Sequence, residues 1–215
     1  MGYALLKKES YKQAKEQFEL VAKSVSAATN NVEKDALLRA ADCWFMNKEY
    51  KQALNIYDGV YNAGWSAADY ALYQKAIIAG ALNKSTDKLQ LLSKLETEYP
   101  NSNYLPFAQM ETANAWLAEE AFEKALTPLY KIINNAKASA LYPQAYLKLG
   151  VTLFNLDKND ASLDQFKILV NKYPNSVESD AAIEYIRNIF IEQQKPAEYL
   201  SLIHISEPTR LGMIS

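Results

Sequence analysis

The sequence predicts an all-α solenoid built from antiparallel helix pairs, because one unit of 36 to 39 residues recurs along the chain. The motif Tyr-Lys-Gln-Ala at 11–14 returns at 50–53, a shift of 39 residues, and in a looser form at 122–125. The motif Tyr-Pro-Asn-Ser at 99–102 returns at 173–176, a shift of 74, or twice 37. A chain with this period is expected to stack one supersecondary unit on the next.

Each unit shows apolar residues at helical spacing in two consecutive stretches. The clearest unit has a first helix and a second helix separated by the polar turn 47–49. Their apolar positions are, in order, Leu37, Leu38, Ala41, Trp44 and Phe45, then Ala53, Tyr57, Val60 and Tyr61. The same pairing is repeated over 110–132 and 146–170, and a further first helix is expected over 179–193.

The junctions between units carry signals for ending one helix and beginning the next. Pro100 and Pro174 follow second helices, where a residue without a backbone N–H ends a helix. The Asn-Ser pairs at 101–102 and 175–176 supply side-chain oxygens that can cap the following first helix. The turn at 83–87 lacks the aromatic residue found in other units, and Lys88 stands near the place where they have alanine.

Composition excludes several classes of function. The 215 residues include 23 Lys and Arg against 25 Asp and Glu, so the chain lacks the positive charge that nucleic-acid binding needs. One cysteine and one histidine exclude a disulfide framework and a Cys- or His-rich metal site. No stretch reaches the roughly 18 to 20 apolar residues of a membrane span.

The order of these residues resembles the tetratricopeptide repeat (TPR). The pattern is a small residue near the end of helix one, an aromatic residue opening helix two, alanine a few residues later, then proline. The best unit contains Tyr146, Leu149, Gly150, Leu153, Phe166, Leu169 and Pro174. The resemblance implies a right-handed superhelix over 1–199, with about five repeats plus a partial one and with incomplete repeats at both ends.

The last sixteen residues do not fit the repeat. Residues 200–210 match, codon by codon, the translation of a transposase-type sequencing adapter, and 211–215 fit its index and following bases. We therefore expect 200–215 to be adapter read-through, and such segments are left out of fold reasoning. His204 would then be part of the adapter, and the remaining chain would contain no histidine.

The resemblance also implies where a partner binds, because the concave wall of a TPR superhelix is formed mainly by first helices. Counting along each unit gives the expected groove residues: Leu38, Asp42, Phe45, Met46, Gln74, Ile78, Met110, Asn114, Leu117, Leu147, Val151, Phe154 and Asn155. This wall is apolar and amide-rich with little charge. Only Asn114 and Asn155 are similar to the clamp that some TPR co-chaperones use for a C-terminal carboxylate, so that function is not expected.

The chain is therefore expected to be a scaffold that binds a protein or peptide, with no catalysis, cofactor or metal. Cys43 has no basic neighbourhood to activate a thiol and is expected to be a buried packing residue. The carboxylates at 119–120 and 96/98 read as a solvated helix face rather than a catalytic pair.

Two cellular settings stay open. The rhythm of the units and the Tyr-Pro-Asn-Ser junctions resemble bacterial cell-envelope TPR proteins of the Tol–Pal and outer-membrane-assembly type. This resemblance implies a piece of a longer protein in the periplasm or at the outer membrane. The alternative is a cytoplasmic TPR sensor or regulator that binds a peptide or small ligand. Uncapped ends of the array are also expected to favour self-association.

Overall fold

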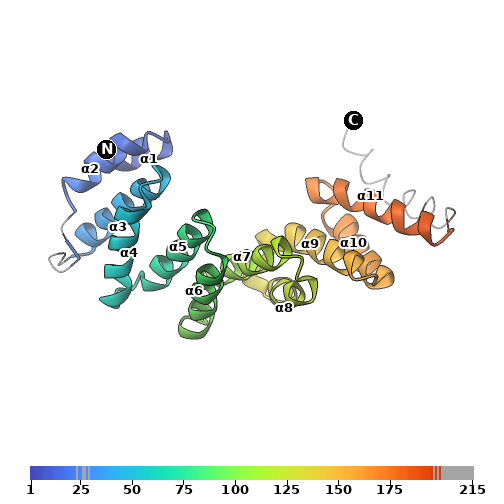
Figure 1. The fold of residues 1–215 in the computed structure, drawn as a ribbon. Helices are drawn as coiled ribbons and strands as arrows, with labels where there is room; N and C mark the ends of the chain where they lie inside the picture. The colour runs from blue at the N-terminus through green and yellow to red at the C-terminus, as the bar shows by residue number, and fades with distance from the viewer. Residues whose placement is uncertain (23, 26–27, 29, 196, 198, 200–215) are drawn as a thin grey trace, which may run out of the picture. The chain divides into compact units, whose positions relative to one another are not determined.

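The computed structural model describes residues 1–199 except 23, 26, 27, 29, 196 and 198, and the expected adapter segment 200–215 lies outside the described residues. The described residues form helices and no strand (Figure 1). The elements are α1 (Gly2–Lys7), α2 (Tyr11–Glu19), α3 (Asn31–Met46), α4 (Tyr50–Asn62), α5 (Ala68–Ala81), α6 (Ser85–Glu98), α7 (Leu105–Ala118), α8 (Phe122–Ile133), the 3₁₀ helix η1 (Ala136–Leu141), α9 (Tyr142–Asn155), α10 (Asn159–Lys172) and α11 (Val177–Glu192). The all-α prediction is confirmed.

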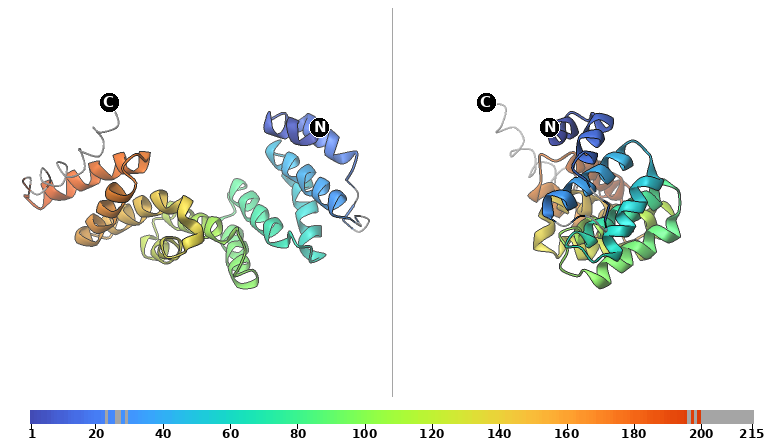
Figure 2. Two further views of the ribbon diagram at one scale, coloured as in Figure 1. Left: turned by 180° about the vertical axis from the view of Figure 1, so that it is seen from behind. Right: turned by 90° about the vertical axis from the view of Figure 1, so that its left-hand side faces the viewer.

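The chain divides into two compact units, residues 1–108 and residues from 109 onward. In the first unit each helix from α1 to α6 packs on its neighbours in sequence, and in the second α8, α9, α10 and α11 do the same. The left view of Figure 2 shows this order from behind, by the colour of the helices. Within each unit, odd-numbered helices are the first helices of the repeats and even-numbered helices are the second.

A backbone turn with positive φ ends each of the six first helices that the structure describes. The residues at these cap turns have φ between 54° and 62°, follow one another at intervals of 35 to 39 residues, and are Glu9, Lys48, Asn83, Glu120, Asp157 and Gln194. In each case the next amide donates to the carbonyl five residues earlier at 2.8 to 3.0 Å, as for Lys158 to Leu153. This hydrogen bond belongs to the Schellman motif.

In the five helix pairs from α1–α2 to α9–α10, a small residue of the first helix lies seven positions before the cap turn, and a large residue of the second helix lies nine positions after it. These partners vary in a complementary way: Gly2 with Phe18, Ala41 with Tyr57, Ala76 with Leu92, Ala113 with Leu129, and Gly150 with Phe166. Phenylalanine is paired with glycine in both units, because the ring leaves no room for a β-carbon on the first helix. A methyl group at Gly2 would lie 3.0 Å from the Phe18 ring, and one at Gly150 would lie 2.3 Å from the Phe166 ring.

The third repeat folds despite its unusual turn. Helix α6 begins at Ser85 directly after the cap turn, although no aromatic residue opens it. A β-carbon at Gly80 would lie 3.1 Å from Cδ of Lys88. The glycine thus leaves room for the lysine stem at the place where the other second helices carry a small residue.

The two Tyr-Pro-Asn-Ser junctions behave differently. Ser176 caps α11 as predicted, since its Oγ accepts the amide of Ser179 at 3.2 Å. Ser102 precedes α7 by three residues and accepts the amide of Tyr104 at 3.0 Å instead. Its hydroxyl donates to Asp69 at the start of α5, at 2.6 Å. The second junction therefore caps a helix, whereas the first ties the junction back to α5.

Candidate functional site

The predicted groove residues do not all reach the surface. Leu38, Ile78 and Met110 are 6%, 0% and 5% exposed. Leu38 and Ile78 belong to the core around Tyr57 in the first unit, and Met110 packs in the core around Leu129 in the second. These three residues therefore belong to the core rather than to a wall that meets a partner.

Asp42 sits in the first unit as the centre of a polar cluster. Its Oδ1 accepts the hydroxyls of Tyr57 and Tyr70, each at 2.6 Å, and its Oδ2 pairs with the guanidinium of Arg39. Burial raises the pKa of Asp42, although Arg39 and both hydroxyls favour its charged form. Burial, followed by the charge of Asp42, raises the pKa of both tyrosines.

This polar cluster ties three helices together, since Asp42 belongs to α3, Tyr57 to α4 and Tyr70 to α5. Gln74, another predicted groove residue, also hydrogen-bonds to Tyr70. With its oxygens already accepting from three groups, Asp42 holds the unit together. Of the remaining predicted positions in this unit, Phe45 packs on Tyr50 at 5.9 Å between ring centroids, and Met46 is exposed.

In the second unit, four predicted residues line one hollow. Leu117, Leu147, Val151 and Asn155 do so together with Phe122 and Lys148, and the hollow has a volume of about 340 Å³. Leu117 lies in the last turn of α7, Phe122 opens α8, and the others project from one face of α9. We call this feature the α7–α9 hollow. The other predicted positions lie apart from it: Asn114 donates to Glu111 at 3.4 Å, and Phe154 packs edge-on against Tyr185.

Sequence reasoning missed two lining residues. Lys148, Val151 and Asn155 follow one another at helical spacing, so the pattern that selected the last two could also have selected the lysine. The loose motif at 122–125 predicts Phe122 only as the aromatic residue that opens a second helix. In the structure it is half-buried, and its remaining surface lines the hollow.

The hollow is apolar with two polar groups. Leu117, Phe122, Leu147 and Val151 supply the apolar surface. Lys148 is half-buried and makes no ion pair with any residue that the structure describes. Asn155 uses its amide nitrogen to donate to the Val151 carbonyl at 3.0 Å, which leaves its side-chain oxygen available. Small sites of this kind combine apolar surface with a few placed polar groups.

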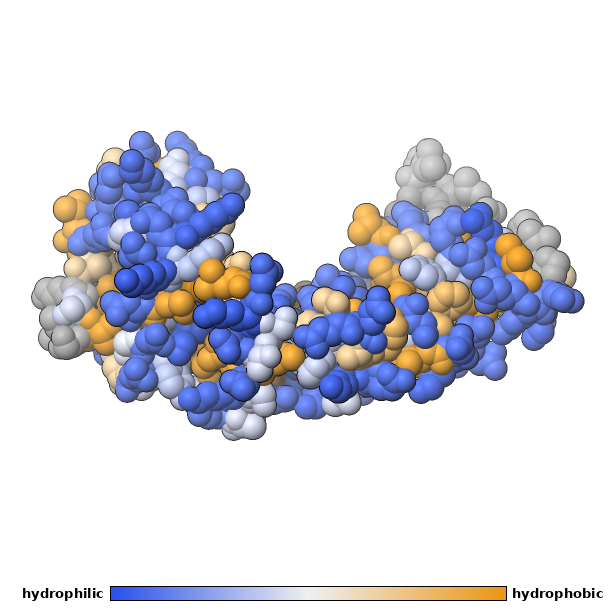
Figure 3. Space-filling model, viewed as in Figure 1, coloured by the Kyte–Doolittle hydropathy of each residue, from blue (hydrophilic) through white to orange (hydrophobic). Residues whose placement is uncertain are grey.

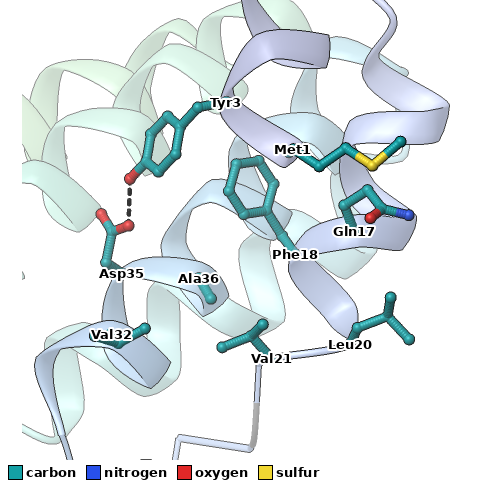
Figure 4. Close-up of a pocket in the computed structure, with 10 residues that line it drawn as sticks. Met1, Tyr3, Gln17, Phe18, Leu20, Val21, Val32, Asp35 and Ala36 are labelled. Atoms are coloured by element: carbon teal, nitrogen blue, oxygen red, sulfur yellow. Dashed lines mark hydrogen bonds between the residues drawn. The ribbon is translucent and has the colours of Figure 1, made fainter.

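A second hollow of about 330 Å³ lies in the first unit between α1, α2 and the start of α3. Figure 4 shows the Phe18 ring at its centre and the Tyr3 hydroxyl bonded to Asp35 on its wall. Its rim includes Met1, Leu20 and Val32, which are 90%, 79% and 69% exposed. This is an exposed apolar surface that no predicted site residue shares.

Outside these two hollows, hydrophobic residues form separate patches on a mostly hydrophilic surface. Most of the face seen in Figure 3 is hydrophilic, with separate hydrophobic patches.

Within the described ranges, no group of three or more His, Cys, Asp or Glu side chains could hold a metal ion. Cys43 is fully buried as predicted, and burial together with Asp42 raises its pKa to about 11. Of the helices in this part of the chain, none combines the length and the apolar character of a membrane span.

Three segments of the chain are similar to a known repeat family. Residues 35–63, 70–102 and 144–176 match the tetratricopeptide repeat family model, less than half of the chain in total. These segments cover most of the pairs α3–α4, α5–α6 and α9–α10. No curated protein sequence matches significantly.

Solved structures are similar in fold at low sequence identity. MamA AMB-1 is 17% identical with a TM-score of 0.60, over 85% of this chain and 94% of that one. A tetratricopeptide repeat protein from Parabacteroides merdae is 15% identical with a TM-score of 0.61, over 94% and 75%. YrrB, described as a TPR protein with an unusual peptide-binding site, is 14% identical with a TM-score of 0.57, over 85% and 88%. The matched segments of this chain are similar to tetratricopeptide repeats, and its fold is an all-α array of helix pairs like that of TPR proteins.

Proposed function

We propose that this protein is a non-catalytic scaffold that binds a peptide segment of another protein in the α7–α9 hollow. The observation that carries the proposal is the meeting of four predicted partner-facing residues in one apolar hollow on α7 and α9. The other predicted positions are buried, committed to internal contacts or apart from it. The peptide-binding site named for YrrB supports a peptide as the kind of ligand.

A matched pair of substitutions tests the proposal. Val151→Asp places a carboxylate in the apolar hollow, whereas Val177→Asp makes the same change at the first residue of α11, where valine is 78% exposed. An acidic residue in a first helical turn is favourable, so the control keeps its fold. Each variant is used as bait beside the unaltered protein, and its helix content is checked by circular dichroism.

Bound proteins are eluted and identified by mass spectrometry. We expect proteins captured by the unaltered chain and by Val177→Asp to be depleted at least tenfold with Val151→Asp. Equal capture by all three baits would refute binding in the hollow.

The cellular setting is a further part of the proposal. We infer a bacterial envelope scaffold, forming part of a longer protein, from the resemblance of the repeat rhythm and the Tyr-Pro-Asn-Ser junctions. Fractionation of the source cells tests this, and recovery with the cytoplasmic fraction would favour the sensor or regulator alternative. In either setting the bait experiment reports on the same hollow.

A further inference from the structure

The α7–α9 hollow contains a positively charged side chain, Lys148, that pairs with no acidic group in the described structure. Lys148 lines an apolar cavity, is half-buried, and forms none of the ion pairs found elsewhere in the molecule. Other partly buried lysines are engaged: Lys15 lies 3.6 Å from the Trp44 ring centroid, and Lys75 pairs with Asp58. An unpaired cation beside apolar surface therefore distinguishes this site within the described residues.

A lysine in this position packs its methylene groups along apolar surface and keeps its ammonium at the rim. The second polar group, the Asn155 amide, stands seven residues further along α9. At 1.5 Å per residue, the two backbone positions are about 10 Å apart along the helix axis. This separation favours two contacts spaced along a ligand over a single carboxylate held by both groups.

The separation matches an extended peptide instead. An extended chain advances about 3.3 Å per residue, so about three residues cover the distance from Asn155 to Lys148. The free oxygen of Asn155 can accept a peptide N–H. Val151 lies between the two polar groups along α9, and Leu147, Leu117 and Phe122 complete the apolar lining of the hollow.

We propose that the hollow recognises an internal, extended segment in which an apolar side chain lies within about three residues of an aspartate or glutamate. The apolar side chain fills the hollow, and the side-chain carboxylate pairs with Lys148. This inference rests on the proposed function, because it specifies the chemistry of the peptide that the same hollow takes.

Selection from random peptides tests the pattern. A phage-displayed library of random twelve-residue peptides is panned on the whole immobilised chain, and enriched peptides are synthesised with amidated C-termini. Amidation removes a terminal carboxylate as a source of charge. We expect the enriched peptides to share an apolar residue with an Asp or Glu nearby, and to bind more weakly as salt concentration rises.

Charge variants then assign the carboxylate to its partner. Lys148→Glu should weaken binding of the synthetic peptides at least tenfold, and Lys148→Gln less, while Lys137→Glu should leave binding unchanged. Lys137 is exposed in η1 and gives the same change of charge outside the hollow. Replacing the peptide's own Asp or Glu by Asn or Gln should reproduce the loss with the unaltered protein and add little in Lys148→Gln.

The outcomes separate the two proposals. In one outcome, Val151→Asp abolishes peptide binding while Lys148→Glu and the replacement of the peptide's Asp or Glu by Asn or Gln leave it unchanged. That result would refute the acidic pattern and keep the hollow as the binding site. If the enriched peptides bind only when they are synthesised again with a free C-terminal carboxylate, the internal-segment assignment is wrong. If no peptide is enriched, or if neither Val151→Asp nor Lys148→Glu affects binding, both proposals fail.

Discussion

Replacement of Gly150 by alanine should destabilise the second unit, although the same change in most helices is favourable. An ideal β-carbon at position 150 would lie 2.3, 2.6 and 2.7 Å from Cε1, Cδ1 and Cζ of Phe166. Carbon atoms in contact normally stand about 3.5 to 4.0 Å apart. The ring has little room to retreat because it is fully buried and stacks on Tyr185 at 5.3 Å between centroids.

Two opposing effects set the size of the loss. Overpacking a close-packed core costs about 1 to 3 kcal/mol, and the contact distances here place Gly150→Ala at the upper end of that range. Glycine in a helix interior is about 0.5 to 1 kcal/mol worse than alanine, and this amount is recovered. The free energy of unfolding should therefore fall by about 2 kcal/mol, measured by urea denaturation followed by circular dichroism.

A second substitution should rescue the first. Phe166→Leu recreates the alanine–leucine pair seen at Ala113 and Leu129, so the double variant should be more stable than the two single losses predict by about 1 kcal/mol or more. Gly80→Ala is the matched control, since its new methyl group meets only the flexible end of Lys88. A neutral Gly150→Ala, or losses that simply add, would refute this account of the helix pair.

Three further outcomes follow from other features. Glu120→Gly should raise the free energy of unfolding by about 0.5 to 1 kcal/mol, because glycine removes the steric strain of a side chain at positive φ. Asn83→Gly should give a smaller gain, because asparagine tolerates this conformation. Thermal melts compare the two variants. Tyr57→Phe should cost about 1.5 to 3 kcal/mol at pH 7, where the charged Asp42 loses a donor that lowers its pKa. This deficit should shrink as pH falls through the Asp42 pKa, and urea denaturation at pH 7 and near pH 4 tests it. Leu20→Glu should reduce concentration-dependent association through the exposed apolar hollow in sedimentation velocity, and unchanged sedimentation would count against that contact.

Helix pairing was predictable because it depends on spacing within one short stretch of chain. The aromatic residues that open α4 and α8, and the positions of Pro100 and Pro174, were read directly from the repeated motifs. The 3₁₀ helix η1 was not predicted, because it interrupts the unit between α8 and α9 without a repeated signal.

The groove was only partly predictable. Counting along first helices selected the face of α9 that lines the hollow but could not separate exposed positions from buried ones, since a helix in an array has neighbours on several sides. Ile78 and Val151 are both apolar and were selected in the same way, yet one is in the core and the other lines the hollow. The partners of Asp42 come from α4 and α5, so its internal role depends on contacts 15 and 28 residues away in sequence.

The cap turns have a consequence for how such a chain changes during evolution. Their geometry is maintained by main-chain hydrogen bonds, and the six side chains at these positions are polar residues of several kinds, none of them glycine. The side chains at these turns can therefore differ while the turn geometry stays the same. Sequence likeness between repeats can fade before their structure does: six cap turns share one geometry here, while three segments match the family model.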